Sequence, residues 1–543
     1  MNQAINPNSQ YFSIVPQNGT QFTAGNKVIF EINPNIAYVK GKDCYLAFDV
    51  FNSSDNNEQI AFPTVAGANS IIDRMDIYSL NNGTLLESLS NVGQWAALEN
   101  QYAHDVKDKL VSRQGVSDSC YAYNVTQNQT TGVTTHVANN RDAAKLADGI
   151  LNQNESGTAI YMARRFILPL RAGLFNHFDL DEKLTPIVLY GGLRIELTLA
   201  DNDKVCCAVE GANGTGRYDP IGTGLVLKND AAVAGGASPV LFSTDANFSS
   251  AELIESCGFV VGNKVLIEGT INGAGGASRV GVITALAVGT AGDADKLQIT
   301  LGSVTGGGNI TATAGGCTMK ITESNRKYTV KRSELKLLQV LPTAAMLKAV
   351  AKESQVSFLS YDLFLDTLPT TSLSHQTEIT SVANRAKAIF TMYTNTATET
   401  NANYEKSYYN GVVPNNVADA RSMRMNSIQY FIDNKLFPLK DYNPQRTKDK
   451  VQAHNEVIKA WSAINVPCKN LGNADGANMA DYTNTFLIAR ELARENMVYQ
   501  LKNSEAELRT KYDNTRAFNC RIYTYVFSEK VVNVADSGLS VIL

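Results

Sequence analysis

The stretch Gly192-Leu193-Arg194-Ile195-Glu196-Leu197-Thr198-Leu199-Ala200-Asp201 decides the fold of this chain. Its apolar side chains alternate with Arg194, Glu196 and Thr198, so one face is apolar and the other polar. This period of two predicts a half-buried β-strand. A second strand-like stretch begins at Lys327-Tyr328-Thr329-Val330 and continues through residues 335–342. Between the two stretches the composition changes abruptly to Gly, Ala, Thr and Val, which indicates a small domain inserted into one loop of a sheet protein.

Without the insert, the two remaining parts of the chain resemble each other. Each part shows strand patterns, then a helical pattern that contains one of the two tryptophans, Trp95 and Trp461, after the third strand, and then further strands. The strand patterns cover residues 27–32, 44–53, 71–78, 163–168 and 193–199 in the first part, and 356–364, 388–395, 428–433, 486–490, 506–512 and 520–527 in the second. This favours an internal duplication. The alternative is a coincidence between two all-β domains with similar strand spacing.

Short strands separated by Gly-, Asn- and Pro-rich connections are typical of sandwiches and jelly rolls. We therefore predict an all-β fold made of two tandem eight-stranded jelly rolls, a double jelly roll. The first roll comprises residues 1–202 plus 324–342, the inserted small β domain 203–323, a linker 343–353, and the second roll 354–543.

The place of the insert follows from labelling the strands of the first roll B to I. Leu193–Leu199 becomes strand H and Tyr328–Leu341 strand I, so the insert occupies the H–I loop of the first roll. Connections alternate between the two ends of an antiparallel sandwich, so this loop shares its end with the D–E loop. We identify the D–E loop with the long polar stretch Glu99–Gly157, and we regard Thr396–Met423 and Asn465–Tyr482 as its counterparts in the second roll.

Within the insert, the residues up to about Ser250 are rich in turn-forming Gly and Asn, which indicates a loop with one or two short strands. From Cys257 to Ile321 the pattern predicts four or five short strands, enough for a small β-barrel. Such a domain is either a recognition module or a purely structural addition.

Composition excludes several classes of function. The chain has 543 residues, 44% of them hydrophobic, and a net charge of −4, so no global basic field attracts nucleic acid. The first twelve residues contain no Lys or Arg and no signal-peptide pattern, and no apolar run reaches the roughly 18 residues of a spanning helix. The cysteines show no metal-binding or paired spacing, so we expect reduced thiols at Cys44, Cys120, Cys206, Cys207, Cys257, Cys317, Cys468 and Cys520.

A search for chemistry finds little. The histidines are scattered at His104, His136, His177, His375 and His454, and no phosphate-binding loop or nucleophile elbow occurs. Asp73 and Asp76 fall on opposite faces of a strand, which makes a poor acid–base pair. The groups Arg164-Arg165 and Arg490, Glu491, Arg494 and Glu495 are typical of surface ion pairs and solvated charges. The tryptophan helices either bind a partner or fill the gap between helix and sheet, and the second is favoured. We predict no catalytic, cofactor-binding or metal-binding residues, no cofactor and no enzymatic activity.

The stretches 189–197, 328–342 and 427–435, within this repeated pattern, resemble the double jelly-roll major capsid proteins of eukaryotic double-stranded DNA viruses, particularly polinton-like viruses and virophages. The resemblance covers nearly the whole chain except the insert. It implies a viral structural protein that forms homotrimers, the pseudo-hexagonal capsomers of an icosahedral capsid, located in the virion shell and assembled inside the host cell. It also implies minor capsid or penton partners and an outward-facing insert that meets a neighbouring subunit or a host receptor.

Two alternatives stay open on the sequence. The first is a β-sandwich surface binding protein, such as a lectin, adhesin or spike. The second is an enzyme of the β-rich hydrolases.

Overall fold

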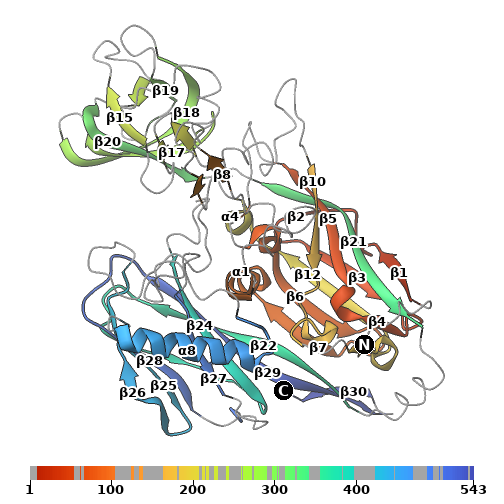
Figure 1. Ribbon diagram of the computed structural model, residues 1–543. Helices are drawn as coiled ribbons and strands as arrows, with labels where there is room; N and C mark the ends of the chain where they lie inside the picture. Colours follow the sequence, from red (N-terminus) through yellow and green to blue (C-terminus); the bar gives the residue numbers. More distant parts are fainter. Residues whose placement is uncertain are drawn as a thin grey trace.

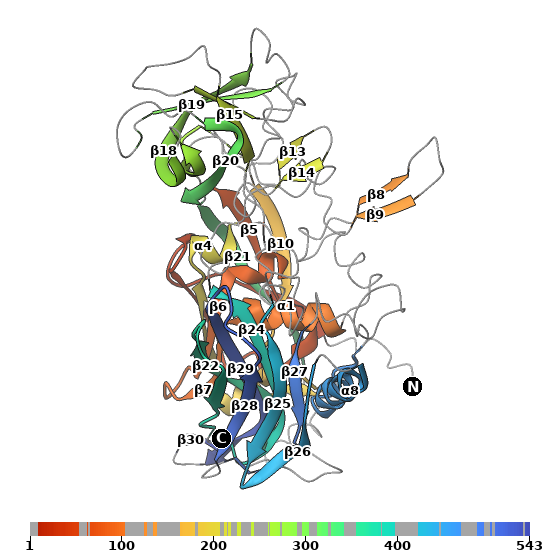
Figure 2. The same cartoon turned by 90° about the vertical axis from the view of Figure 1, so that its left-hand side faces the viewer.

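The computed structural model describes residues 9–53, 62, 66–103, 124–127, 134–137, 163–179, 183–206, 211–213, 216–218, 225–229, 240–243, 259, 261–271, 274–289, 296–302, 304, 312–323, 327–341, 355–381, 383–396, 422–444, 447–468, 486–492, 500–501, 505–535 and 538–542. Two β-sandwiches lie side by side, and a small barrel stands beyond one end of the first (Figure 1). Figure 2 shows the strands of both sandwiches running roughly along one common direction.

The first sandwich is a jelly roll. One sheet has the order β1-β21-β5-β10 and the facing sheet β3-β12-β6-β7, which are the B-I-D-G and C-H-E-F orders of a jelly roll. The strands are β1 (Ser9–Ile14), β3 (Lys27–Ile32), β5 (Tyr45–Asn52), β6 (Ile72–Ser79), β7 (Leu85–Ser90), β10 (Ala163–Pro169), β12 (Leu193–Leu199) and β21 (Tyr328–Val340). Three short strands, β2 (Gln21–Thr23), β4 (Tyr38–Lys40) and β11 (Leu184–Thr185), extend the first sheet beyond the eight predicted strands.

The second sandwich repeats this order. Its sheets are β22-β29-β24-β27 and β23-β28-β25-β26, again B-I-D-G and C-H-E-F. The strands are β22 (Gln355–Leu368), β23 (Ser374–Glu378), β24 (Ala386–Asn395), β25 (Met425–Ile432), β26 (Lys435–Tyr442), β27 (Ile488–Glu491), β28 (Ala506–Tyr512) and β29 (Cys520–Ala535), with β30 (Gly538–Ile542) added along β29. The predicted double jelly roll is confirmed.

The two long helices occupy equivalent places. Helix α1 (Val92–Ala103) and helix α8 (Thr447–Ala463) each follow strand F of their roll and carry Trp95 and Trp461. This confirms the predicted equivalence of the tryptophans, but the helices follow the fifth strand of each roll, not the third. The sequence analysis missed β1 and β7 in the first roll and β23 and β26 in the second. Further single turns are η1 (Gly41–Asp43), η2 (Gly67–Ile71), η3 (Gly173–Phe175) and η4 (Ile187–Tyr190).

The polar stretch Glu99–Gly157 was assigned to the wrong loop. It begins inside α1 and belongs to the F–G connection, whereas the D–E connection covers residues 53–71. Both connections lie at the same end as the H–I loop, because alternate connections of an antiparallel sandwich share an end. In the second roll, residues 396–423 form the D–E connection and residues 465–482 part of the F–G connection. Most residues of these stretches, and the predicted linker 343–353, lie outside the described residues.

The insert folds into a closed barrel. Its strands are β15 (Leu225–Asn229), β16 (Val240–Ser243), β19 (Leu297–Leu301), β18 (Ala274–Val288), β17 (Lys264–Ile271) and β20 (Ala312–Glu323), in that order around the barrel. The predicted strands between Cys257 and Ile321 are present as β17, β18, β19 and β20, but the barrel is larger than predicted, because β15 and β16 from the preceding part complete it. The barrel has a core of its own, separate from the cores of the rolls, that includes Leu227, Ile267, Ile299 and Met319.

Two short hairpins lie outside the sandwiches and the barrel. One is formed by β13 (Gly211–Asn213) and β14 (Gly216–Tyr218), the other by β8 (Asn124–Gln127) and β9 (Thr134–Val137).

The insert leaves the first roll later than predicted. The predicted boundary after residue 202 falls inside helix α4 (Asn202–Val205), and Val205 and Cys206 are buried in the core of the first roll. Strands β12 and β21 lie in opposite sheets of the first roll, so the two ends of the insert are not attached to hydrogen-bonded neighbouring strands. The two ends of the insert are nevertheless held together, because the Tyr328 hydroxyl donates a hydrogen bond to the carbonyl oxygen of Ala200 at 2.5 Å.

Candidate functional site

The residues that the sequence offered for chemistry have separate partners. Asp73 forms an ion pair with Lys204 and Asp76 one with Arg74, each at 2.9 Å, and His375 Nε2 lies 2.8 Å from the carboxylate of Asp366. Among the described residues, no group of His, Cys, Asp and Glu is arranged to hold a metal ion. No helix in the described part of the chain is long and apolar enough to span a membrane. Several predicted residues lie outside the described part of the chain: Cys120, Cys207, Cys257 and the side chains of His104, His136, Arg164, Arg494 and Glu495.

Two of the predicted surface groups have structural partners. Arg165 bridges Asp49 and Glu334, each at 3.1 Å, as expected for surface ion pairs. Arg490 was expected in a solvated charged face, but its side chain is only 16% exposed and bonds to Glu456 of α8. This ion pair holds α8 against β27.

The most distinctive feature of the molecule is the contact between its two rolls, which we call the seam. It joins α1, β7 and η3 of the first roll to β22, β24 and β29 of the second (Figure 1). Strand β29 shows why the contact forms. Ile522 and Val526 point into the core of the second roll, whereas Tyr525 and Phe527 point outward and join the core of the first roll. The sheet is therefore buried on both faces.

Aromatic rings fill the seam around Trp95. Its ring centroid lies 4.6 Å from that of Phe527, 5.2 Å from Tyr525 and 5.5 Å from Trp461. Trp461 in turn lies 4.9 Å from Phe390. The prediction that each tryptophan fills a gap between helix and sheet is confirmed, but for Trp95 the sheet belongs to the other roll. Tilted and edge-on rings at these spacings add to the stabilisation from burial.

A buried carboxylate links the rolls across the seam. Glu87 of β7 accepts hydrogen bonds from the backbone N–H groups of Gly173 and Leu174, both at 2.9 Å, and from the Ser360 hydroxyl of β22 at 2.6 Å. Burial raises the pKa of Glu87 above its ordinary value, although these hydrogen bonds and the charge of Lys530 lower it in part. Removing the side chain would leave three buried donors without an acceptor at this point of contact.

Gly173 lets the two backbones approach closely. A Cβ atom at this position would lie 1.9 Å from the carbonyl oxygen of Leu359 in β22, far inside van der Waals contact. Near by, Lys530 of β29 is almost fully buried and pairs with Asp362 at 2.8 Å. The seam therefore combines close aromatic packing with a partnered buried charge.

A second buried charge cluster anchors α1 to its own roll. Glu99 accepts from the Arg171 guanidinium at 2.9 Å and lies 2.9 Å from His177 Nε2. Arg171 also donates to Asn69 and to Asn100. Burial alone would raise the pKa of Glu99, but the charges of His177 and Arg171 outweigh it and hold that pKa well below its ordinary value.

We expect Glu99→Gln to destabilise the chain by about 3 kcal/mol, because Arg171 would keep a buried charge without a counter-ion. The folded pKa of Glu99 is depressed, so its contribution is fully present above the unfolded value of 4.5 and is lost as the pH falls below it. The difference between wild type and variant should therefore shrink below about pH 4.5 in urea unfolding followed across pH. The control Glu334→Gln removes a half-buried carboxylate whose partner Arg165 is 41% exposed, and screening by solvent should limit the cost to about 1 kcal/mol or less. Equal costs of the two variants would contradict the role of burial.

The comparisons with known proteins yield structural matches. No protein-family model and no curated protein matches the sequence. One matching solved structure is VP54 of PBCV-1, fitted into a reconstruction of the virophage Sputnik. The match has 10% sequence identity and a TM-score of 0.46, and it covers 99% of this chain and 97% of that chain. The Faustovirus major capsid protein has 8% identity, 98% and 92% coverage and a TM-score of 0.47. The mavirus major capsid protein has 9% identity, 98% and 90% coverage and a TM-score of 0.34.

Matches at these identities and scores do not establish a function. The function of this chain therefore rests on its own strand order and packing.

Proposed function

We propose that this chain is a major capsid protein, the subunit of an icosahedral virus shell, and that it assembles as a homotrimer. The observation that carries this proposal is the head-to-tail packing of its duplicated rolls. The seam joins the F strand and F–G helix of the first roll to the B, I and D strands of the second. The two rolls therefore use different surfaces to contact each other, although their folds are equivalent.

A head-to-tail contact between two rolls leaves two surfaces uncovered: the B side of the first roll and the F side of the second. Repetition of such a contact closes into a ring when the rotation permits and otherwise gives a filament. Three chains of two rolls would give a ring of six rolls, a pseudo-hexagonal unit suited to tiling a shell. The strands of both rolls run along a common direction, as expected for rolls packed around one axis (Figure 2).

The proposal places the chain in the virion shell, assembled inside a host cell and joined to minor capsid or penton proteins. The barrel lies beyond the end of the first roll that carries the H–I loop (Figures 1 and 2), and the resemblance to double jelly-roll capsid proteins implies that this end faces outward from the shell. The role is structural and assigns no catalysis, cofactor or metal to the chain. No feature of the described residues specifically favours a lectin, adhesin or spike.

Light scattering of the purified chain tests this proposal. We expect a stable species near three times 58.9 kDa, or larger hexagonal arrays. A chain that stays monomeric at all concentrations and binds sugars would contradict the capsid proposal and support the surface-binding alternative.

The purified chain should not bind duplex DNA tightly. With a net charge of −4 it lacks the basic field that attracts phosphates. We expect a Kd weaker than about 1 μM at about 150 mM salt, measured by fluorescence anisotropy. Tighter binding that weakens steeply with added salt would show a phosphate-binding surface and contradict this prediction.

Replacing residues 207–326 by a short Gly/Ser turn should leave both rolls folded. The barrel has its own core, and the contact of Tyr328 with Ala200 closes the base of the insert without it. Loop-closure entropy favours the shorter connection by about 0.6 kcal/mol for each halving of its length, so the deletion should not lower the free energy of unfolding. Far-ultraviolet circular dichroism and tryptophan fluorescence report on the rolls, since Trp95 and Trp461 lie outside the insert.

An insoluble deletion variant would show that the rolls need the barrel to fold. A folded variant that cannot form trimers would make the barrel part of the assembly contact. A variant that assembles but fails to attach to cells would make it a recognition module.

A further inference from the structure

Equivalent strands of the two rolls differ sharply in exposure. In the second roll, strand B (β22) is buried by the seam along Phe358, Leu359, Ser360 and Tyr361. In the first roll, strand B (β1) alternates between half-buried and exposed, and Tyr11 on it is 58% exposed. The surface along strand B is therefore covered by the seam in the second roll, whereas the equivalent surface along β1 in the first roll is uncovered.

The surfaces formed by strand F and its following helix differ in the opposite sense: they are buried in the first roll and exposed in the second. Every described side chain of α1 is buried, and Leu86, Glu87 and Leu89 of β7 are buried as well. The equivalent strand β26 is exposed from Leu439 to Asp441, with Leu439 itself 90% exposed, and α8 exposes a stripe that includes Val451 at 49%. The second roll therefore presents an uncovered F side, which we call the open F face.

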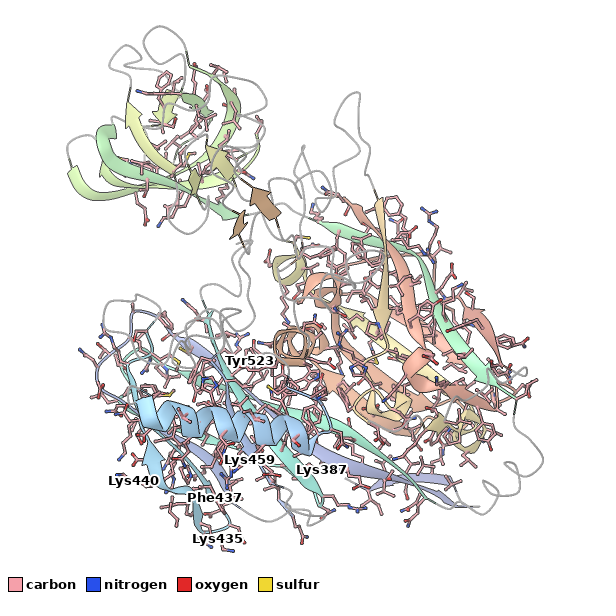
Figure 3. The ribbon with its side chains drawn as sticks, viewed as in Figure 1. Lys387, Lys435, Phe437, Lys440, Lys459 and Tyr523 are labelled. Atoms are coloured by element: carbon pink, nitrogen blue, oxygen red, sulfur yellow. The ribbon has the colours of Figure 1, made fainter. Side chains whose placement is uncertain are left out.

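The open F face lies on one side of the second roll. Figure 3 shows the labelled side chains of Lys435, Phe437 and Lys440 on β26 and Lys459 on α8 on the side turned to the viewer. No ion pair is recorded for Lys435 or Lys440 among the described residues, whereas Lys459 contacts Glu456 at 3.5 Å. Exposed apolar side chains with a rim of polar and charged ones are a feature of surfaces that bind other proteins.

We propose that the open F face, formed by β26 and the exposed stripe of α8, binds the β1 side of the first roll in a second copy of this chain. The proposal rests on the self-assembly proposed above and names the surfaces that carry it. The seam indicates which surface binds there, because in the seam the F side of the first roll already contacts strand B of the second roll. The only other open B strand in the described part of the chain is β1, which can meet the open F face only from another copy.

The contact would be made by side chains, without an added strand. Lys435, Pro438 and Lys440 lie along β26, and both lysines and prolines on an edge strand oppose pairing with a further strand. The seam has the same character, since β7 forms its ladder with β6 alone and meets β22 through Glu87 and Ser360. Leu439 and Val451 on one copy would thus pack against the region of Tyr11 and Val15 on the next, where Val15 is 62% exposed.

The test compares variants of the full chain by light scattering and sedimentation. Leu439→Asp combined with Val451→Asp should weaken self-association at least about 10-fold, because it places two charges at the centre of the contact. Both positions are exposed, so the monomer should keep the wild-type Tm. The control Leu373→Asp changes a leucine that is 54% exposed, in the B–C turn of the second roll away from both surfaces, and should associate like wild type.

A mixing experiment shows which surfaces meet. Tyr11→Asp with Val15→Asp damages the β1 side and leaves the open F face intact. In a mixture of the two variants, the open F face of the Tyr11→Asp, Val15→Asp variant can still bind the β1 side of the Leu439→Asp, Val451→Asp variant. We therefore expect one-to-one complexes that do not grow further. Homodimers of either variant alone would show a different contact.

The outcomes separate the two proposals. Trimers of wild type together with unchanged trimers of the Leu439→Asp, Val451→Asp variant would overturn the open F face and leave the capsid proposal standing. A wild-type chain that never associates would overturn both.

Discussion

Leu197→Asp is expected to prevent the first roll from folding. Leu197 lies at the centre of β12, is 1% exposed, and packs against the opposite sheet. The void beside it measures about 10 Å³ and is lined mainly by apolar side chains such as Val28 and Phe48, which leaves no room for waters around a carboxylate. An unpaired carboxylate at this place costs several kcal/mol, comparable to a large part of the stability of a domain.

The neighbouring variant Thr198→Asp is the matched control. Thr198 is half-buried on the outer face of the same strand, and its register partners are Lys27 and Arg74. A carboxylate there lies between two cations in contact with solvent, so the change should be close to neutral. Soluble yield and urea unfolding decide the comparison. If both variants fold equally well, Leu197 does not face the core, and the register of β12 is wrong.

Where one face of a strand meets the core and the other meets water, the sequence alone predicted the strand. Leu193–Leu199 followed from its period of two, and the count of strands from B to I placed the insert in the H–I loop. The missed strands have a different environment. Strand β26 carries lysines and a proline because it is an edge, and β15 and β16 are short strands within a Gly- and Ala-rich segment. The alternation of apolar and polar residues is therefore a weak predictor of strands at sheet edges and in segments rich in turns.

The seam was not predicted, although its signal was present. Strand β24 reads Ala-Lys-Ala-Ile-Phe-Thr-Met-Tyr-Thr-Asn, with apolar residues on both faces. A strand of this kind is buried on both sides, which indicates a second contact surface beyond the core of its own roll. Its partner was not predictable, because Glu87 and Ser360 meet across a separation of 273 residues and each looks like an ordinary surface residue in the sequence.

Trp95→Ala is expected to open the seam. Trp95 is fully buried, and its ring contacts Tyr361, Phe390, Tyr525 and Phe527 of the second roll. Truncation removes the side chain that both rolls share, and the loss for a buried tryptophan is about 3–5 kcal/mol. We expect this loss to fall on the contact between rolls, since the inner core of the second roll, with Leu508 and Val526, does not include Trp95.

The experiment follows two signals during urea unfolding. Fluorescence of Trp461 reports on the seam, where it lies 5.5 Å from Trp95, and circular dichroism reports on the strands of both rolls. In Trp95→Ala the fluorescence change should precede the loss of strand signal, because the rolls separate before they unfold. The control Trp95→Phe keeps an aromatic ring in the cluster and should retain coincident transitions with a smaller loss. Coincident transitions in Trp95→Ala, with a loss below about 1 kcal/mol, would show that the aromatic cluster does not hold the rolls together, because a loss that small is far below the cost of truncating a buried tryptophan.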